Sequence, residues 1–360
     1  MTFTNLLIIA LWAAAIYAFA VVAFTWYVMY RYGATIIQVF KRKPLLVADD
    51  HPPAKTAQPV SFKSAGGRML RGSYLCHLAP KRVGVILFCH EFTGDRWLWE
   101  PYLAPLLADG FDVLTFDFCN HGASDSVPGY EPLQWVTDHE VADVRAALDY
   151  LKNRPDAEEW GVGAFGVSKG GGALLAAAAR EPYVKAIVVD GAYPNHGTVV
   201  EYMTKWVGIF APGKFVCDRL PRWFYAALCE LTLLRLQKMW KVKYARLERS
   251  VRDCGARPLL AIHGERDNYI TVPIAERFFA ENKSPDKELW IVPGAKHNQS
   301  VAKAGDEYRG KLRDFLLKHL GGERPRTPAP PGESLGAEGD GGVHAAARLR
   351  ADSGSPIGAS

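Results

Sequence analysis

The chain has 360 residues, of which 49% are hydrophobic, and a formal net charge of +5. This length and composition allow a substantial buried core, as one large domain with appendages or as two domains. The positive excess is small and the basic stretches carry no nucleic-acid motif, so we expect no nucleic-acid partner and at most attraction to an anionic membrane surface. The six cysteines form no C-x-x-C pair. We therefore expect buried free thiols, and neither a metal site nor a cofactor.

The first predicted element is an apolar stretch without charged side chains over residues 6–30. As a helix it would be roughly 37 Å long at ~1.5 Å per residue, enough to cross a hydrocarbon core of about 30 Å. Aromatic side chains of the kind found at membrane interfaces gather at its end: Trp26, Tyr27, Tyr30 and Tyr32. Basic residues follow at Arg31 and 41–43. The positive-inside rule then predicts a single-pass anchor over residues 1–32 with the bulk of the chain in the cytoplasm, where free thiols persist.

A cleavable signal peptide is the alternative interpretation of this stretch. No Lys or Arg precedes the apolar run, and its A-x-A sequence, Ala18-Phe19-Ala20, lies in the middle of the run. Both features favour an uncleaved anchor. A polar, proline-bearing tether is expected over residues 33–58.

From residue 59 to about 320 the pattern alternates between strands and helices. Expected strands are 60–64, 69–77, 83–89, 112–118, 161–167, 185–190, 258–263 and 288–292. The later strands are near-continuous apolar or β-branched runs, typical of parallel strands buried on both faces. Helical patterns lie at 102–108, 138–151, 168–180, 272–281 and 302–319. The alternation predicts an α/β domain with a doubly wound sheet over residues 59–320.

Two segments depart from the alternation. Residues 192–257 form an insertion rich in Trp, Phe, Leu and basic residues. Residues 321–360 are rich in Gly, Pro, Ala, Ser and Glu with few large apolar side chains, so a disordered tail is expected there.

A G-x-S-x-G pentapeptide with Ser168 at its centre follows the expected strand 161–167. After a strand, this pattern is typical of a sharp turn into a helix that exposes a nucleophilic serine. A Cβ atom at Gly166 or Gly170 would clash in such a turn, and the serine itself is expected to be strained. The pattern also occurs by chance in glycine-rich loops, where its serine is a surface residue. The rest of the chain must therefore supply catalytic partners.

A nucleophilic serine needs a base, and the base needs an orienting carboxylate. Asp267 lies on the loop after the expected strand 258–263, and His297 on the loop after the next strand. The carboxyl ends of parallel strands share one edge of the sheet, so both side chains can converge on Ser168. Asp190, at the end of an earlier strand, is the alternative acid.

Acyl transfer also needs hydrogen-bond donors for the oxyanion. The backbone N–H of Lys169, at the start of the helix after Ser168, is one candidate because the positive end of the helix dipole lies there. The second should come from the loop after the strand that ends at Cys89. The N–H of Phe92 in that loop is our candidate.

Five motifs occur in one order along residues 59–320: H-E-F-T-G (90–94), D-F-C-N-H-G-A-S (117–124), G-V-S-K-G (166–170), G-E-R-D (264–267) and G-A-K-H (294–297). In this order they resemble the landmarks of α/β-hydrolase-fold proteins. The resemblance implies a mostly parallel sheet with a helical lid over residues 192–257, and serine hydrolysis by Ser168, Asp267 and His297.

One detail departs from the commonest family pattern. Many members have His-Gly where this chain has His90-Glu91, which resembles the dienelactone-hydrolase-like branch instead. That branch typically uses cysteine as nucleophile, whereas residue 168 is serine. Glu91 either tunes the site or bonds to backbone. The turn 120–124 is expected to be structural, beneath the site.

Within the insertion, apolar residues recur at helical spacing: Leu233, Leu236, Trp240, Tyr244, Leu247 and Val251. They predict an amphipathic, basic helix. The stripe either packs on the core or, with Trp206, Phe210, Trp223 and Phe224, lines an acyl pocket that faces the bilayer.

Together these features predict a membrane-anchored serine hydrolase that cleaves a carboxylic ester or thioester of a hydrophobic or lipid substrate. The partners expected are that substrate and the bilayer, and the sequence leaves the oligomeric state open. An acyltransferase or peptidase on the same triad, or a non-catalytic hydrolase-like membrane scaffold, are the alternatives.

Overall fold

The computed structural model describes residues 2–41, 51–210 and 220–322. The predicted tail over 323–360, Cys217 and the middle of the predicted tether lie outside these residues. The side chains of Trp206 and Phe210 also lie outside the described part.

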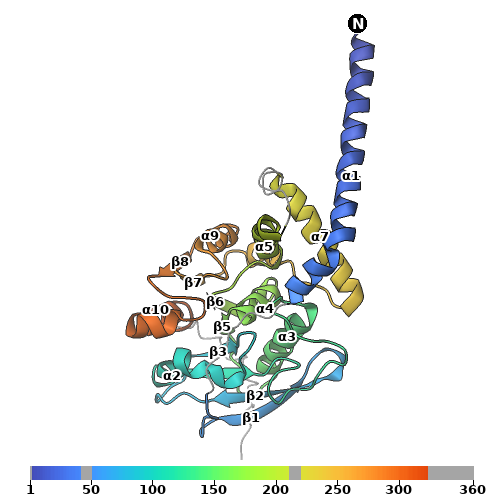
Figure 1. The fold of residues 1–360 in the computed structure, drawn as a ribbon. Helices are drawn as coiled ribbons and strands as arrows, with labels where there is room; N and C mark the ends of the chain where they lie inside the picture. Colours follow the sequence, from blue (N-terminus) through green and yellow to red (C-terminus); the bar gives the residue numbers. More distant parts are fainter. Residues whose placement is uncertain (1, 42–50, 211–219, 323–360) are drawn as a thin grey trace, which may run out of the picture. The chain divides into compact units, whose positions relative to one another are not determined.

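An eight-stranded sheet forms the centre of the described chain (Figure 1). Its strands are β1 (Gln58–Lys63), β2 (Met69–Leu75), β3 (Gly84–Cys89), β4 (Phe111–Phe116), β5 (Val162–Val167), β6 (Val184–Asp190), β7 (Leu259–Gly264) and β8 (Lys287–Val292). The spatial order is β1-β2-β4-β3-β5-β6-β7-β8. β2 runs antiparallel to β1 and β4, and the pairs from β4 to β8 are parallel. The prediction of a doubly wound, mostly parallel sheet is confirmed.

Helices cover both faces of the sheet, with α2 and α10 on one side and α3 and α4 on the other (Figure 1). The helices that alternate with strands are α2 (Glu100–Ala108), α3 (Asp138–Lys152), α4 (Lys169–Ala178), α9 (Val272–Ala280) and α10 (Ser300–Leu320), with short 3-10 turns at Ala65–Gly67 and Arg96–Trp99. Leu87 of β3 packs in the layer under α3 and α4, whereas its neighbours Ile86 and Phe88 pack in the layer under α2 and α10. The central strands β3, β4, β5 and β7 are buried along their whole length, as the near-continuous apolar runs indicate, whereas the edge strands β1 and β8 are partly exposed.

The insertion between β6 and β7 contains α5 (Asn195–Phe210), α7 (Arg222–Trp240) and α8 (Leu247–Asp253). The expectation of one amphipathic helix through 233–251 is wrong, because Lys241 adopts a left-handed conformation (φ 55°) that ends α7. The apolar stripe lies at buried or half-buried positions: Leu233, Leu236, Trp240, Tyr244, Leu247 and Val251. These six side chains therefore pack on the core and do not themselves face a bilayer.

The N-terminal helix α1 (Phe3–Lys41) continues beyond the expected end of the anchor at residue 32. Residues 33–41, expected to begin the tether, are therefore helical. The helix is long and apolar enough to cross a membrane, a test that a signal sequence also passes. Its C-terminal end belongs to the core: Phe40 is buried and its ring stacks on Trp135 at 5.0 Å.

Candidate active site

The turn between β5 and α4 holds Ser168 in a strained conformation. Ser168 has φ 51° and ψ −116°, which L-residues rarely adopt, and it joins the last residue of β5 to the first of α4. A Cβ atom at Gly166 would lie 2.6 Å from Cα of Gly171, and one at Gly170 would lie 2.2 Å from the carbonyl oxygen of His90. Both glycines are therefore required by close backbone approach.

Three side chains from separate loops meet at this turn. Ser168 Oγ lies 2.9 Å from Nε2 of His297, and Nδ1 of His297 lies 2.5 Å from Oδ2 of Asp267. All three residues are buried. Asp267 follows β7 and His297 follows β8, so neighbouring parallel strands deliver them to the edge of the sheet where β5 ends.

Backbone amides fix the Asp267 carboxylate. Its Oδ1 accepts hydrogen bonds from the N–H groups of Tyr269 (2.9 Å) and Ile270 (2.8 Å), which leaves Oδ2 directed at His297. The other buried neighbour is His263, whose Nε2 lies 3.6 Å from Oδ2. The loop after β7 thus fixes the orientation of the Asp267 carboxylate that faces the His297 imidazole.

The environment of His297 favours its protonated form. Burial alone lowers the pKa of the imidazole, but the hydrogen bond and charge of Asp267 outweigh burial, and Glu91 adds to the effect. The pKa of His297 therefore lies above its ordinary value of 6.5. In its neutral form such an imidazole is a stronger base, and so accepts a proton from an attacking hydroxyl more readily.

Asp190, the alternative acid, has different partners. Its Oδ1 accepts a hydrogen bond from Ser300 Oγ (3.0 Å) and its Oδ2 accepts one from the Tyr308 hydroxyl (2.9 Å). Burial raises the pKa of Asp190 to about 6. The geometry therefore favours Asp267 as the carboxylate that orients His297.

His90 fixes the peptide that joins Glu91 to Phe92. Its Nε2 accepts a hydrogen bond from the N–H of Phe118 (3.1 Å), so its Nδ1 carries the proton and donates to the carbonyl oxygen of Glu91 (2.7 Å). Burial lowers the pKa of His90 well below 6.5, which agrees with a neutral ring. In a trans peptide the carbonyl and the next N–H point in opposite directions. The Glu91 bond therefore sets the direction of the Phe92 N–H.

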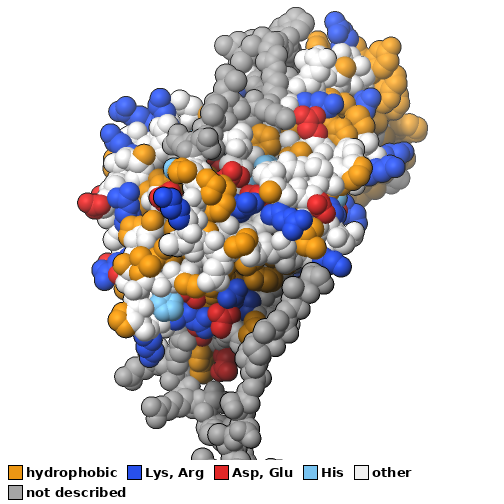
Figure 2. Space-filling view, turned by 90° about the horizontal axis from the view of Figure 1, so that it is seen from below, with side chains coloured by type: hydrophobic (Ala, Val, Ile, Leu, Met, Phe, Trp, Pro, Cys, Tyr) orange, Lys and Arg blue, Asp and Glu red, His pale blue; other side chains and the backbone are white. Residues whose placement is uncertain are grey.

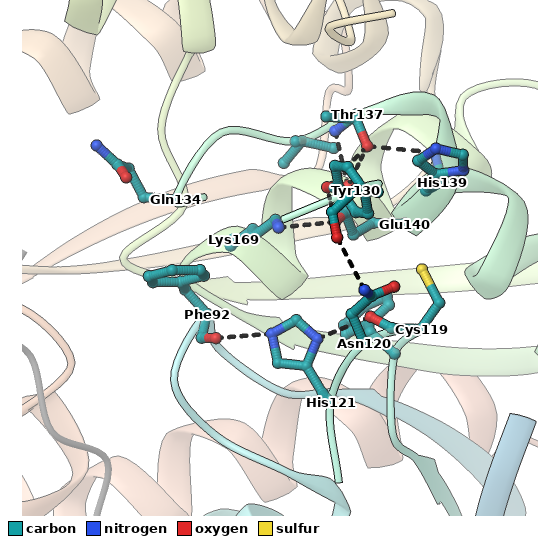
Figure 3. A network of polar contacts seen from close by, with 12 residues as sticks. Phe92, Cys119, Asn120, His121, Tyr130, Gln134, Thr137, His139, Glu140 and Lys169 are labelled. Carbon is teal, nitrogen blue, oxygen red and sulfur yellow. Dashed lines mark hydrogen bonds and ion pairs between the residues drawn. The ribbon is translucent and has the colours of Figure 1, made fainter. Parts of the chain in front are cut away.

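His121 ties the turn 120–124 to the same loop. Its Nε2 lies 2.8 Å from the carbonyl oxygen of Phe92 and its Nδ1 lies 2.9 Å from that of Cys119 (Figure 3). Burial lowers the pKa of this imidazole. The turn thus supports the Phe92 loop through a half-buried histidine.

A buried ion pair lies on the other side of Phe92 (Figure 3). Nζ of Lys169 lies 2.7 Å from Oε1 of Glu140 and 5.4 Å from the centroid of the Phe92 ring. Glu140 also accepts hydrogen bonds from the Tyr130 hydroxyl (2.5 Å) and from the N–H and hydroxyl of Thr137. Burial raises the pKa of Glu140, but the charge and hydrogen bond of Lys169 outweigh it and lower the pKa below its ordinary value. The Lys169 side chain thus contacts both Glu140 and the ring of Phe92, the other residue expected to hold the oxyanion.

Comparison with solved structures identifies this architecture. A family model described as alpha/beta hydrolase fold matches residues 84–210. The structure of the esterase Pf2001 from Pyrococcus furiosus covers 78% of this chain and 98% of its own, with a TM-score of 0.56 and 22% sequence identity. The protein has the α/β-hydrolase fold.

Curated relatives of this α/β-hydrolase-fold protein are similarly distant in sequence. The uncharacterized protein YfhR of Escherichia coli K12 is 23% identical over 275 residues, which cover 75% of this chain and 84% of YfhR. The thiohydrolase aneE of Aspergillus aculeatus is 27% identical over 135 residues, which cover 37% of this chain and 41% of aneE.

Sequence reasoning missed the residues that surround the Lys169 ammonium in the α/β-hydrolase-fold protein. Thr137 and Glu140 form a T-x-x-E capping box at the start of α3, which is readable in the sequence. Nothing in that motif indicates that the same carboxylate also pairs with a lysine beside the nucleophile. Among the described ranges 2–41, 51–210 and 220–322, no three His, Cys, Asp or Glu side chains form a group that could hold a metal ion.

Proposed function

We propose that this α/β-hydrolase-fold protein is a membrane-anchored serine hydrolase that cleaves a carboxylic ester or thioester of a hydrophobic substrate. The observation that carries the proposal is the hydrogen-bonded series from Ser168 Oγ through His297 to Asp267, at 2.9 and 2.5 Å. A serine with a base in contact, and a base oriented by a buried carboxylate, is the arrangement needed for acyl transfer.

In the proposed reaction Ser168 Oγ attacks the acyl carbon while its proton moves to Nε2 of His297. The amides of Phe92 and Lys169 then stabilise the oxyanion. One such donor is typically worth about 3 kcal/mol of transition-state stabilisation. The leaving alcohol or thiol takes the proton from His297 as its bond to the acyl carbon breaks. Water then attacks the acyl-enzyme and gives a proton to His297. His297 returns this proton to Ser168 Oγ as the bond between Oγ and the acyl carbon breaks and the free acid departs.

The fold of an esterase and a local likeness to a thiohydrolase support an ester or thioester as the substrate class. The apolar N-terminal helix α1 supports a substrate that resides in a bilayer, since an anchor would hold the site near such molecules. Arg31 and Lys41 on the same side of the apolar stretch favour the cytoplasmic face.

A fluorophosphonate probe tests the catalytic proposal. The probe should label the purified full chain, and the Ser168→Ala variant should lose all labelling. Ser126→Ala is the matched control, because Ser126 is an exposed serine outside the site. The proposal fails if the intact protein is not labelled or if Ser168→Ala is labelled as fast as Ser126→Ala.

Substrate class is tested with esters and thioesters of increasing acyl length. We expect kcat/KM to rise with chain length, and we expect no turnover by Ser168→Ala. Good hydrolysis of short soluble esters with none of long-chain ones would contradict a hydrophobic substrate. The products formed with competing alcohols or amines separate hydrolysis from acyl transfer.

The anchor is tested separately by its retention in membranes. We expect the full chain to resist extraction by alkaline carbonate, and intact-mass measurement to show the N-terminal residues still present. Cleavage after the apolar stretch would show instead that α1 is a signal sequence.

A further inference from the structure

The outward face of α7 is apolar although its inward face is already packed. Phe224 and Leu228 on the inward face are 3% and 1% exposed. On the opposite face Trp223, Leu231 and Leu234 are 50%, 42% and 51% exposed. A helix that is apolar on both faces has a second apolar neighbour or lies at a membrane. These three residues are called here the outer face of α7.

Helix α7 runs beside α1 in the same direction. Contacts join the two helices along α7: Phe24 with Phe224 (5.5 Å between ring centroids), Met29 with Thr232, and Phe40 with Trp240 (6.4 Å). The contacts nearest to Leu231 and Leu234 are those of Thr232 with Met29 and of Arg235 with Gly33. This part of α7 therefore lies at the level of residues 29–33 of α1.

The polarity of the two helices changes at the same level. In α1 the apolar stretch ends in the aromatic residues 26–30, and Arg31 is its first charge. In α7 the outer face ends at Leu234, and Arg235, which lies against Gly33 of α1, is followed by exposed Lys238 and Lys241. Apolar and then basic side chains in this order match the passage from acyl chains to phosphate headgroups.

Arg222, the first residue of α7, lies at the apolar end of the helix. Its Nη1 is 2.9 Å from Oε1 of Glu201, so it has a partner at that level. The face of the molecule seen in Figure 2, turned away from the N-terminal end of α1, instead carries Lys, Arg, Asp and Glu interspersed with hydrophobic side chains. The outer face of α7 thus differs from the ordinary surface of the domain.

We propose that the outer face of α7 inserts into the headgroup and outer acyl region of the leaflet from which α1 emerges. The inference rests on the proposed anchoring by α1 and adds a second, peripheral contact with the bilayer. The contact of Phe40 with Trp135 holds the end of α1 to the core. The bilayer would then contact the domain at two places, through α1 and through the outer face of α7, and together these contacts fix the orientation of the domain. The insertion that carries α7 is thereby held at the lipid surface.

Photo-crosslinking of the full chain tests this proposal. p-Benzoylphenylalanine is placed at Leu231 or Leu234, and the protein is reconstituted into phosphatidylcholine–phosphatidylglycerol vesicles that contain an alkyne-tagged phospholipid. The matched control is Leu78, an exposed leucine (71%) just after β2. Leu11 in α1 serves as the positive reference for membrane insertion. We expect lipid adducts at Leu231 and Leu234 severalfold above those at Leu78.

Three results would overturn the inference. The first is a lipid yield at Leu231 and Leu234 no higher than at Leu78. The second is a negative result at Leu11, which removes the anchor. The third is a crosslinked product of twice the chain mass, which shows that a second copy covers the face. Fluorophosphonate labelling of the same samples separates the two proposals, because labelled protein without lipid adducts contradicts the membrane contact alone.

Discussion

The ammonium of Lys169 and the carboxylate of Glu140 form a buried ion pair, with 2.7 Å between Nζ and Oε1, directly beside the strained serine. Lys169 is 3% and Glu140 0% exposed in their side chains. The pair connects the first residue of α4 with the first turn of α3. Both partners have further contacts, which offset the cost of removing two charges from water.

Removal of one partner of this pair should reduce both stability and catalysis. Glu140→Gln leaves a buried ammonium and Lys169→Met leaves a buried carboxylate, and the loss of one partner of a buried pair typically costs about 3–5 kcal/mol of unfolding free energy. Because Lys169 also supplies an oxyanion amide in the proposed mechanism, we expect kcat to fall with little change in KM. Urea unfolding and steady-state kinetics measure the two effects.

The double variant Lys169→Met, Glu140→Gln separates the charge pair from a general loss of packing. Without either charge, unfolding free energy should recover relative to both single variants. If kcat also recovers, the pair acts only by keeping the fold intact. If kcat per titrated active site stays low while stability recovers, the pair positions the oxyanion amide.

The Asp267→Asn variant should shift the pH profile as well as lower the rate. The proposed base must be neutral to accept a proton, so kcat/KM of the native chain falls as pH drops through the raised pKa of His297, above 6.5. Without the carboxylate only burial remains as the dominant influence, and it lowers that pKa. The acid limb should therefore move to lower pH, with a rate loss of about 10³–10⁴-fold.

Asp190→Asn is the control for this shift, because Asp190 bonds to Ser300 and Tyr308 and leaves the Asp267–His297 hydrogen bond in place. Its acid limb should move less than that of Asp267→Asn. A larger shift in the control would make Asp190 the functional acid.

Two glycine-to-alanine substitutions should have opposite effects. In Gly170→Ala the new Cβ would meet the carbonyl oxygens of His90 and Cys89 at 2.2 and 2.4 Å, so the turn between β5 and α4 must deform and activity should be lost. In Gly310→Ala, within α10, the Cβ meets nothing within 4 Å. Alanine there should raise the unfolding free energy by about 0.5–1 kcal/mol. Thermal unfolding and fluorophosphonate labelling of both variants check the contrast.

The alternating strands and helices of this fold could be predicted from the sequence because the central strands are buried on both faces. For the same reason the loops that carry Ser168, Asp267 and His297 could be placed at one sheet edge. The spacing of apolar residues over 233–251 did not predict the end of α7 at Lys241. This single left-handed residue divides the apolar stripe between α7 and α8. The partner of Lys169 was also hidden, because it depends on how α3 and α4 pack side by side on one face of the sheet.

His90 should control the proposed oxyanion site without taking part in proton transfer. In His90→Ala the Glu91 carbonyl loses the His90 donor and keeps the Gly94 N–H (3.2 Å), and the buried Phe118 N–H loses its acceptor, so the Phe92 amide is held less firmly in direction. The loss of one oxyanion donor predicts a fall in kcat of about 10²–10³-fold. Because His90 is neutral and its pKa lies well below 6.5, the acid limb of kcat/KM should stay in place, unlike in Asp267→Asn. A fall in kcat together with a displaced acid limb would show that His90 titrates during catalysis, contrary to a positioning role.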